Sequence, residues 1–157
     1  MRTFLLALAL ALLGAGCTAD DTTAVPEAED PVVSDNYFGV SNAYTRAAPS
    51  GGVSAVFLQI ENTTAQPDTL VAVRTDASDD VEMHETITTP DSLRRMQPTD
   101  AIPVPAGTTV TLEPGALHIM LLDLTRDLTK GDTLLVEFEF SERGTLIARA
   151  PIQGLAP

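Results

Sequence analysis

The chain has 157 residues and a formal net charge of −13, and its only lysine is Lys130. So acidic a chain would be repelled by the phosphates of nucleic acids, which argues against a nucleic-acid partner, and it has no polybasic patch for electrostatic binding to a membrane surface. Its one cysteine, Cys17, lies near the N-terminus, so the rest of the chain has no internal disulfide, thiolate metal site or cysteine nucleophile.

The first 16 residues, MRTFLLALALALLGAG, have the pattern of a secretory signal. Arg2 supplies a positive charge, and the apolar run from Phe4 to Leu13 is too short for a stable membrane span. The ending AGC resembles a bacterial lipoprotein cleavage box, in which the cysteine, here Cys17, is lipidated. The alternative is an ordinary signal peptide with a chance cysteine. We expect an extracytoplasmic lipoprotein, anchored to a membrane in the periplasm or cell envelope.

The next segment, residues 17–36, is acidic, rich in threonine and proline, and without hydrophobic periodicity, which predicts a flexible tether. Residues 37–157 are long enough for one domain with a single core. They contain short alternating segments separated by turn residues, and none keeps a helical period over three turns. The expected strands are 53–62, 69–75, 81–87, 93–97, 102–104, 108–114, 116–124, 133–140 and 145–152. This pattern predicts an all-β sandwich or barrel.

The segment ALHIMLLDL, residues 116–124, has an unusual second face. Because side chains alternate along a strand, one face should carry a core row of Leu117, Ile119 and Leu121. The opposite face then carries His118 and Met120, which is unexpected unless something covers or uses that face. Taken alone, a His-x-Met pair is more often packing than chemistry.

The other histidine, His84, and Met96 enlarge this set. They lie in consecutive predicted strands, and pairing of those strands would bring them close. Two imidazoles and two thioethers make a soft, neutral donor set that favours Cu(I) over hard cations. Zn²⁺ prefers thiolate, imidazole or carboxylate ligands, and iron–sulfur clusters and blue-copper sites need cysteine. If these residues bind a metal, Cu(I) is therefore the best choice.

The spacing of the four residues resembles the signature H(M)x10Mx21HxM of the PCuAC family of periplasmic copper chaperones. Eleven residues separate His84 from Met96, twenty-one separate Met96 from His118, and one separates His118 from Met120. The resemblance covers nearly all of residues 37–152, including YTRAAP, AVFLQIEN and the long segment from MQPTD to FEF. Glu85 stands where the family has an optional second methionine.

The resemblance implies a cupredoxin-like β-sandwich with Greek-key topology that binds one Cu(I) through His84, Met96, His118 and Met120. It implies a monomeric carrier, not an enzyme, that delivers copper to an acceptor protein. That acceptor would be a cytochrome c oxidase subunit, for assembly of its binuclear copper centre, or another copper chaperone. Because the chain ends at ARAPIQGLAP, without the His- and Met-rich tail of some members, a single site is expected.

Another function stays open beside this one. A metal-free, membrane-anchored β-sandwich lipoprotein with a binding or structural role would have histidines that are buried or far apart.

The charged residues near the four candidate ligands each have two possible roles. Glu82 and Glu85 are either solvated strand positions, or one of them orients an imidazole. Arg94 and Arg95 either contact a partner or offset nearby acidic residues.

Overall fold

The computed structural model describes residues 36–154, in which all regular structure is β-strand. No helix in this range is long and apolar enough to cross a membrane. The predicted signal, Cys17 and the predicted tether up to residue 35 lie outside the described residues. The strands are β1 (Phe38–Arg46), β2 (Ser54–Asn62), β3 (Asp68–Thr75), β4 (Asp80–Thr88), β5 (Arg94–Pro98), β6 (Ile102–Val104), β7 (Thr108–Leu112), β8 (His118–Leu122), β9 (Thr133–Phe140) and β10 (Gly144–Gln153).

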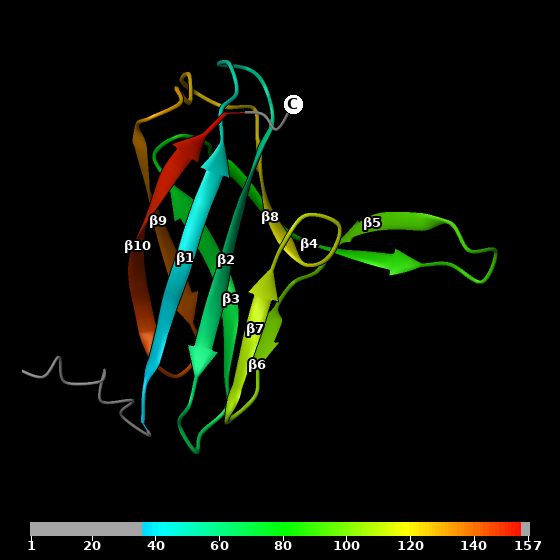
Figure 1. Cartoon of the computed structure of the whole chain (residues 1–157), viewed down its shortest axis with the longest axis vertical. Coiled ribbons are helices and arrows are strands. Elements are labelled where there is room, and N and C mark those ends of the chain that lie inside the picture. Colours follow the sequence, from blue (N-terminus) through cyan, green and yellow to red (C-terminus); the bar gives the residue numbers. More distant parts are fainter. Residues whose placement is uncertain (1–35, 155–157) are drawn as a thin grey trace, which may run out of the picture. The chain divides into compact units, whose positions relative to one another are not determined.

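These strands form two packed layers, as Figure 1 shows. Hydrogen bonding runs in the order β5-β4-β8-β2-β1-β10-β9-β3-β6, and β7 pairs with β2 beyond the part of β2 that pairs with β8. The layers are joined where β1 and β10 run parallel, with Thr45 opposite Ile152. The all-β sandwich expected from the alternating segments is confirmed.

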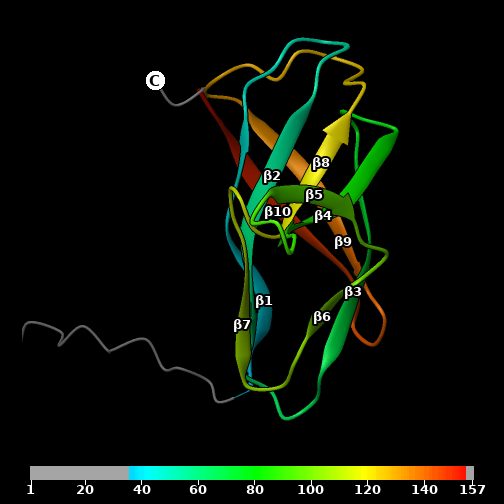
Figure 2. The same cartoon turned by 90° about the vertical axis from the view of Figure 1, so that its right-hand side faces the viewer.

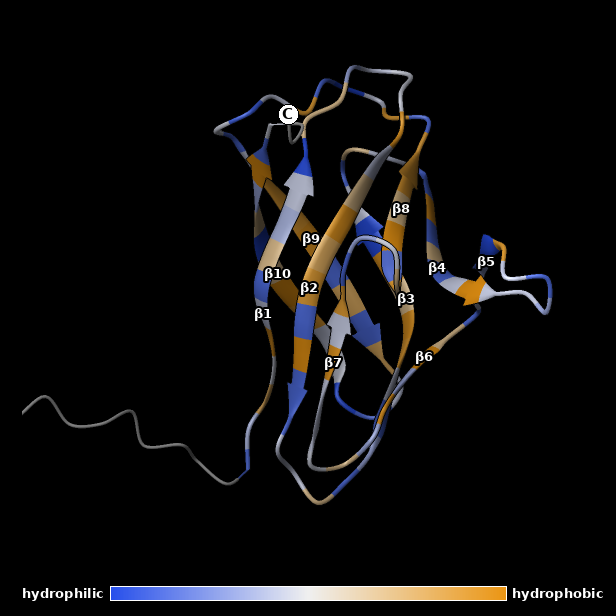
Figure 3. Ribbon diagram, turned by 45° about the vertical axis from the view of Figure 1, so that its right-hand side comes forward, coloured by the Kyte–Doolittle hydropathy of each residue, from blue (hydrophilic) through white to orange (hydrophobic). Residues whose placement is uncertain are grey.

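The core lies between the layers and follows the alternation of the strands. In β9, Leu134, Val136, Phe138 and Phe140 are buried, while Leu135 points outward and is 49% exposed. In β8, Ile119 and Leu121 are fully buried, as the predicted core row requires, and Leu117 packs against them. Figure 3 shows this hydrophobic character along β2, β8 and β9.

Strand β1 departs from regular alternation, which is why its pattern alone does not predict it. The register between β1 and β2 shifts between Ser41 and Tyr44, and Asn42 at this bulge has φ 52°. A bulge places two residues opposite one and so reverses the inward and outward order of the side chains. Only the resemblance of YTRAAP to the opening strand of a known family pointed to a strand here.

The β4–β5 hairpin carries part of the candidate site. Beyond its pairing with β8, β4 continues with β5 as a two-stranded ribbon that projects from the sandwich (Figure 1). The chain reverses at Thr89–Ser92, where the amide of Thr89 donates to the carbonyl of Leu93 and Ser92 adopts φ 65°. Figure 2 looks onto the side of the molecule where β5, β4 and β8 lie.

Candidate metal centre

The structure brings the two histidines together. Strands β4 and β8 pair antiparallel with His84 directly opposite His118, so the two side chains leave the same face of the sheet. Their ring centroids are 5.8 Å apart. His118 is buried, with 4% of its surface exposed, and the side chain of His84 is 15% exposed. Two imidazoles thus face one small volume.

The two methionines lie on the same face. Met120 stands opposite Glu82, one same-face position along β8 from His118. Strands β4 and β5 pair antiparallel, which is the condition that the sequence argument set for bringing Met96 close to His84, and the register places Met96 opposite Thr86, two residues from His84. Met120 is half-buried, whereas Met96 is 59% exposed. The roles of these four residues as ligands stay a prediction.

Each imidazole has one nitrogen that is occupied by a hydrogen bond. Nδ1 of His118 lies 2.9 Å from the carbonyl oxygen of Ala116, an acceptor, so Nδ1 carries the proton and Nε2 keeps its lone pair. Nε2 of His84 lies 2.6 Å from Oε2 of Glu82, and Nδ1 of His84 is buried without a hydrogen-bond partner. One nitrogen on each ring is therefore available to an electrophile such as a metal ion.

Aromatic rings lie beside His118 on the same face of the sheet. The ring centroid of Phe57, in β2, lies 6.4 Å from that of His118 and 5.0 Å from that of Tyr44 in β1. The guanidinium carbon of Arg46 lies 5.6 Å from the centroid of Phe57. Phe57 is only 5% exposed although it points away from the core. This row of rings explains why the second face of β8 tolerates a histidine.

The acidic neighbours of His84 have different partners. Only Glu82 contacts the imidazole. Glu85 points to the other face of β4, where it accepts a hydrogen bond of 2.7 Å from Nε2 of Gln97 on β5. Met83 is buried in the core, as its alternation with His84 requires. Alternation along β4 already favours Glu82, which lies two residues from His84 and shares its face, over Glu85, which is the next residue and faces the other way.

The hairpin is held beside the site by the turn between β7 and β8. Arg94 donates a hydrogen bond from its guanidinium to the carbonyl of Gly115. The hydroxyl of Thr86 donates to the carbonyl of Ala116 at 3.4 Å. Arg94, whose role the sequence left open, therefore contacts its own chain and connects the strand that carries Met96 to the turn that precedes His118.

The donor types near the histidines limit which metals would fit. Within residues 36–154, no group of three or more histidine, cysteine, aspartate or glutamate side chains is arranged to hold a metal ion. Met96 and Met120 lie on the same face as His84 and His118, so thioethers are the other donors that the strand register brings beside the two imidazoles. That donor set suits Cu(I) and not a hard cation.

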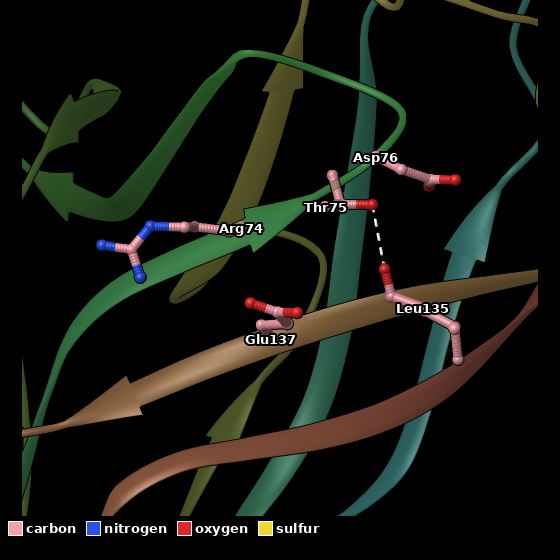
Figure 4. Close-up of a pocket in the computed structure, with 5 residues that line it drawn as sticks. All are labelled: Arg74, Thr75, Asp76, Leu135 and Glu137. Carbon is pink, nitrogen blue, oxygen red and sulfur yellow. Dashed lines mark hydrogen bonds between the residues drawn. The ribbon is translucent and has the colours of Figure 1, made fainter.

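A separate pocket of about 300 Å³ lies on β3 and β9 and contains none of the four predicted ligands. Figure 4 shows its lining residues, with Thr75 donating a hydrogen bond of 2.9 Å to the carbonyl of Leu135. Arg74 in this pocket pairs with Glu139 at 2.6 Å, and this hydrogen bond raises the pKa of Arg74. Both side chains are exposed, so the pair is an ordinary surface salt bridge between neighbouring strands.

Comparison with known proteins gives a family and a fold. The family model described as "Putative lipoprotein LpqE-like" matches residues 39–152. The protein "Putative lipoprotein Lxx21020" of Leifsonia xyli subsp. xyli (strain CTCB07) is 32% identical over 114 residues, which are 73% of this chain and 68% of that protein.

Among solved structures, the copper-bound PCuAC domain from PmoF2 is 22% identical with a TM-score of 0.61, covering 75% of this chain and 96% of that one. The solution structure of CuI-DR1885 from Deinococcus radiodurans is 24% identical with a TM-score of 0.54, covering 73% and 78%. The expected resemblance to PCuAC domains is thereby confirmed at the level of the fold.

Proposed function

The chain belongs to the LpqE-like lipoprotein family, and from its PCuAC fold we propose that it is an extracytoplasmic Cu(I)-binding metallochaperone. One observation carries this proposal: His84 and His118 lie side by side, each with a nitrogen free to bind, on the face that also carries Met96 and Met120. The copper seen in the domains of similar fold from PmoF2 and DR1885 supports the choice of metal.

The proposed site holds Cu(I) through neutral donors only. Two imidazoles and two thioethers leave the bound ion with its single positive charge, and thioethers stabilise Cu(I) against Cu(II). A site that stabilises one oxidation state is suited to carriage, not to redox turnover, so the proposed function is binding and transfer, without enzymatic activity.

Transfer would begin at Met96. This residue is 59% exposed on a projecting hairpin, whereas His118 is 4% exposed beneath its neighbours. An incoming ligand of the acceptor can reach the exposed side first and replace Met96, while His84 and His118 still hold the metal. Copper then passes through an intermediate shared by both proteins and is never free in solution.

The proposed setting is extracytoplasmic, with the domain anchored to a membrane in the periplasm or cell envelope. Lipidation of Cys17, with residues 17–36 as a tether, would hold the domain there. The proposed acceptor is another extracytoplasmic copper protein, such as the oxidase subunit with the binuclear copper centre or a second chaperone. Membership of a lipoprotein family supports the proposed location. The resemblance of the sequence motif to that of copper chaperones supports the choice of acceptor.

A titration tests the binding function. The purified protein competes anaerobically with a chromophoric chelator for Cu(I), alongside His118→Ala, Met120→Ala and the core control Met83→Leu. We expect one tightly bound equivalent, weakened at least about tenfold in the first two variants and unchanged in the control. Absence of competition by the unsubstituted protein would favour the metal-free lipoprotein, for which the burial of His118 is the supporting observation.

A further inference from the structure

Among residues 36–154, Glu82 makes the one side-chain hydrogen bond to His84, and this bond can select which ring nitrogen carries the proton. The two residues are separated by one position on β4 and so share a face. Oε2 of Glu82 lies 2.6 Å from Nε2 of His84. Glu82 also stands directly opposite Met120, so its carboxylate lies at the border of the four-residue cluster.

An ionised carboxylate only accepts hydrogen bonds, so Nε2 of His84 must supply the proton. In the neutral ring the lone pair is then on Nδ1. That nitrogen is buried and has no hydrogen-bond partner. A buried polar atom without a hydrogen-bond partner is unfavourable and is uncommon in folded proteins, so it points to a role for this nitrogen. In His84, the contact with Glu82 therefore selects one tautomer, and the lone pair of that tautomer, on Nδ1, has no hydrogen-bond partner.

His118 has the opposite arrangement. The carbonyl of Ala116 takes the proton of Nδ1 and leaves Nε2 free. The nitrogens without a hydrogen bond are therefore Nδ1 of His84 and Nε2 of His118, on rings whose centroids lie 5.8 Å apart.

We propose that Glu82 is a positioning residue that holds His84 as its Nε2–H tautomer, so that copper is bound by Nδ1 of His84 and Nε2 of His118. This inference rests on the proposed function. Without the carboxylate, neutral His84 would divide its population between two tautomers and several ring orientations, and only part of it would be competent to bind. Loss of such hydrogen-bond partners of metal-binding histidines commonly lowers metal affinity about 10- to 100-fold.

The test reads the tautomer directly, without metal. Two-bond ¹H–¹⁵N correlation spectra of the full-length, ¹⁵N-labelled protein in detergent distinguish protonated from unprotonated ring nitrogens. We expect His84 to be protonated at Nε2 in the unsubstituted protein and in Glu82→Gln, whose amide oxygen still accepts the bond. Glu82→Ala should give a mixture of tautomers. The Nδ1–H signal of His118 should stay unchanged in every variant, which reports that the fold is intact.

Glu85→Ala is the matched control, because it removes the same charge one residue from His84 but from the other face of the strand. Cu(I) affinity should fall about 10- to 100-fold in Glu82→Ala, remain close to that of the unsubstituted protein in Glu82→Gln, and not change in Glu85→Ala. An unaltered His84 tautomer in Glu82→Ala would overturn the positioning role whether or not copper binds. Failure of every variant and of the unsubstituted protein to bind Cu(I), with the tautomer shift intact, would refute the chaperone function alone.

Discussion

The four predicted ligands differ in how much each side chain contributes to the packing of the fold. His118 is packed against Phe57 and hydrogen-bonded to Ala116, so its substitution disturbs packing as well as binding. Met96 is exposed on the hairpin. A substitution at Met96 therefore separates metal binding from stability most cleanly, because an exposed side chain contributes little to the core.

At Met96, replacement by leucine keeps an apolar side chain of similar volume and removes only the sulfur. We expect Met96→Leu to lower Cu(I) affinity about tenfold or more, equivalent to about 1.4 kcal/mol, while changing the free energy of unfolding by less than about 0.5 kcal/mol. Chelator competition and urea denaturation measure the two quantities. Equal affinity in Met96→Leu and the unsubstituted protein would remove Met96 from the ligand set.

Among the elements, the β4–β5 hairpin matters most for the site, because it carries Met96 and is joined to the β7–β8 turn. Arg94 makes that connection by donating to the carbonyl of Gly115. The added Cβ of a Gly115→Ala variant would lie 3.0 Å from the Arg94 guanidinium, which shows how closely the two segments approach. The position of Met96 thus depends on a contact far from it in sequence.

The hydrogen bond between Arg94 and Gly115 leads to a prediction. Arg94→Ala should increase amide hydrogen exchange in residues 86–98 and lower Cu(I) affinity several-fold, because Met96 would be held less firmly beside the histidines. Its neighbour Arg95, which lies on the opposite face of β5, provides the control. If Arg95→Ala had the same effect on affinity, the cause would be the loss of a positive charge and not the loss of the hydrogen bond to Gly115.

Elements with regular alternation could be predicted from the sequence, and those with irregular backbone could not. Strand β9 alternates over its length, and Leu135, the one residue out of step, is indeed exposed. The bulge at Asn42 in β1 hides the same signal. At the site, the shared face of His118 and Met120 follows from alternation. The same alternation separates Glu82 from Glu85, but which ring nitrogen of His84 meets the carboxylate depends on side-chain rotamers, which spacing along a strand does not specify.

For the molecule as a whole, one acidic residue affects stability because it is buried in the fold. Asp68, at the start of β3, is buried and accepts hydrogen bonds from the β9–β10 turn and from Arg143. Burial acts to raise the pKa of Asp68, but hydrogen bonds from the amides of Thr69 and Glu142, from Ser141 and from Arg143 outweigh it, and the pKa is lowered below the ordinary value of 3.8.

A lowered pKa in the folded state means that ionised Asp68 stabilises the fold above the unfolded pKa. This contribution is lost as the pH falls from about the ordinary value of 3.8 through the lower folded value. We expect Asp68→Asn to cost about 1–3 kcal/mol of unfolding free energy at pH 7, and the difference from the unsubstituted protein to shrink in this acidic window. Urea denaturation at several pH values measures it. A difference independent of pH would show that the ionised form is not the stabilising one.

In the proposed Cu(I) carrier, all four side chains bind one metal ion. X-ray absorption at the copper edge of the Cu(I)-loaded protein counts the nitrogen and sulfur neighbours directly. We predict two nitrogens at about 2.0 Å and two sulfurs at about 2.3 Å, by analogy with zinc, with one nitrogen lost in His118→Ala and one sulfur lost in Met120→Ala. A spectrum without sulfur, or one unchanged by both substitutions, would contradict the proposed site.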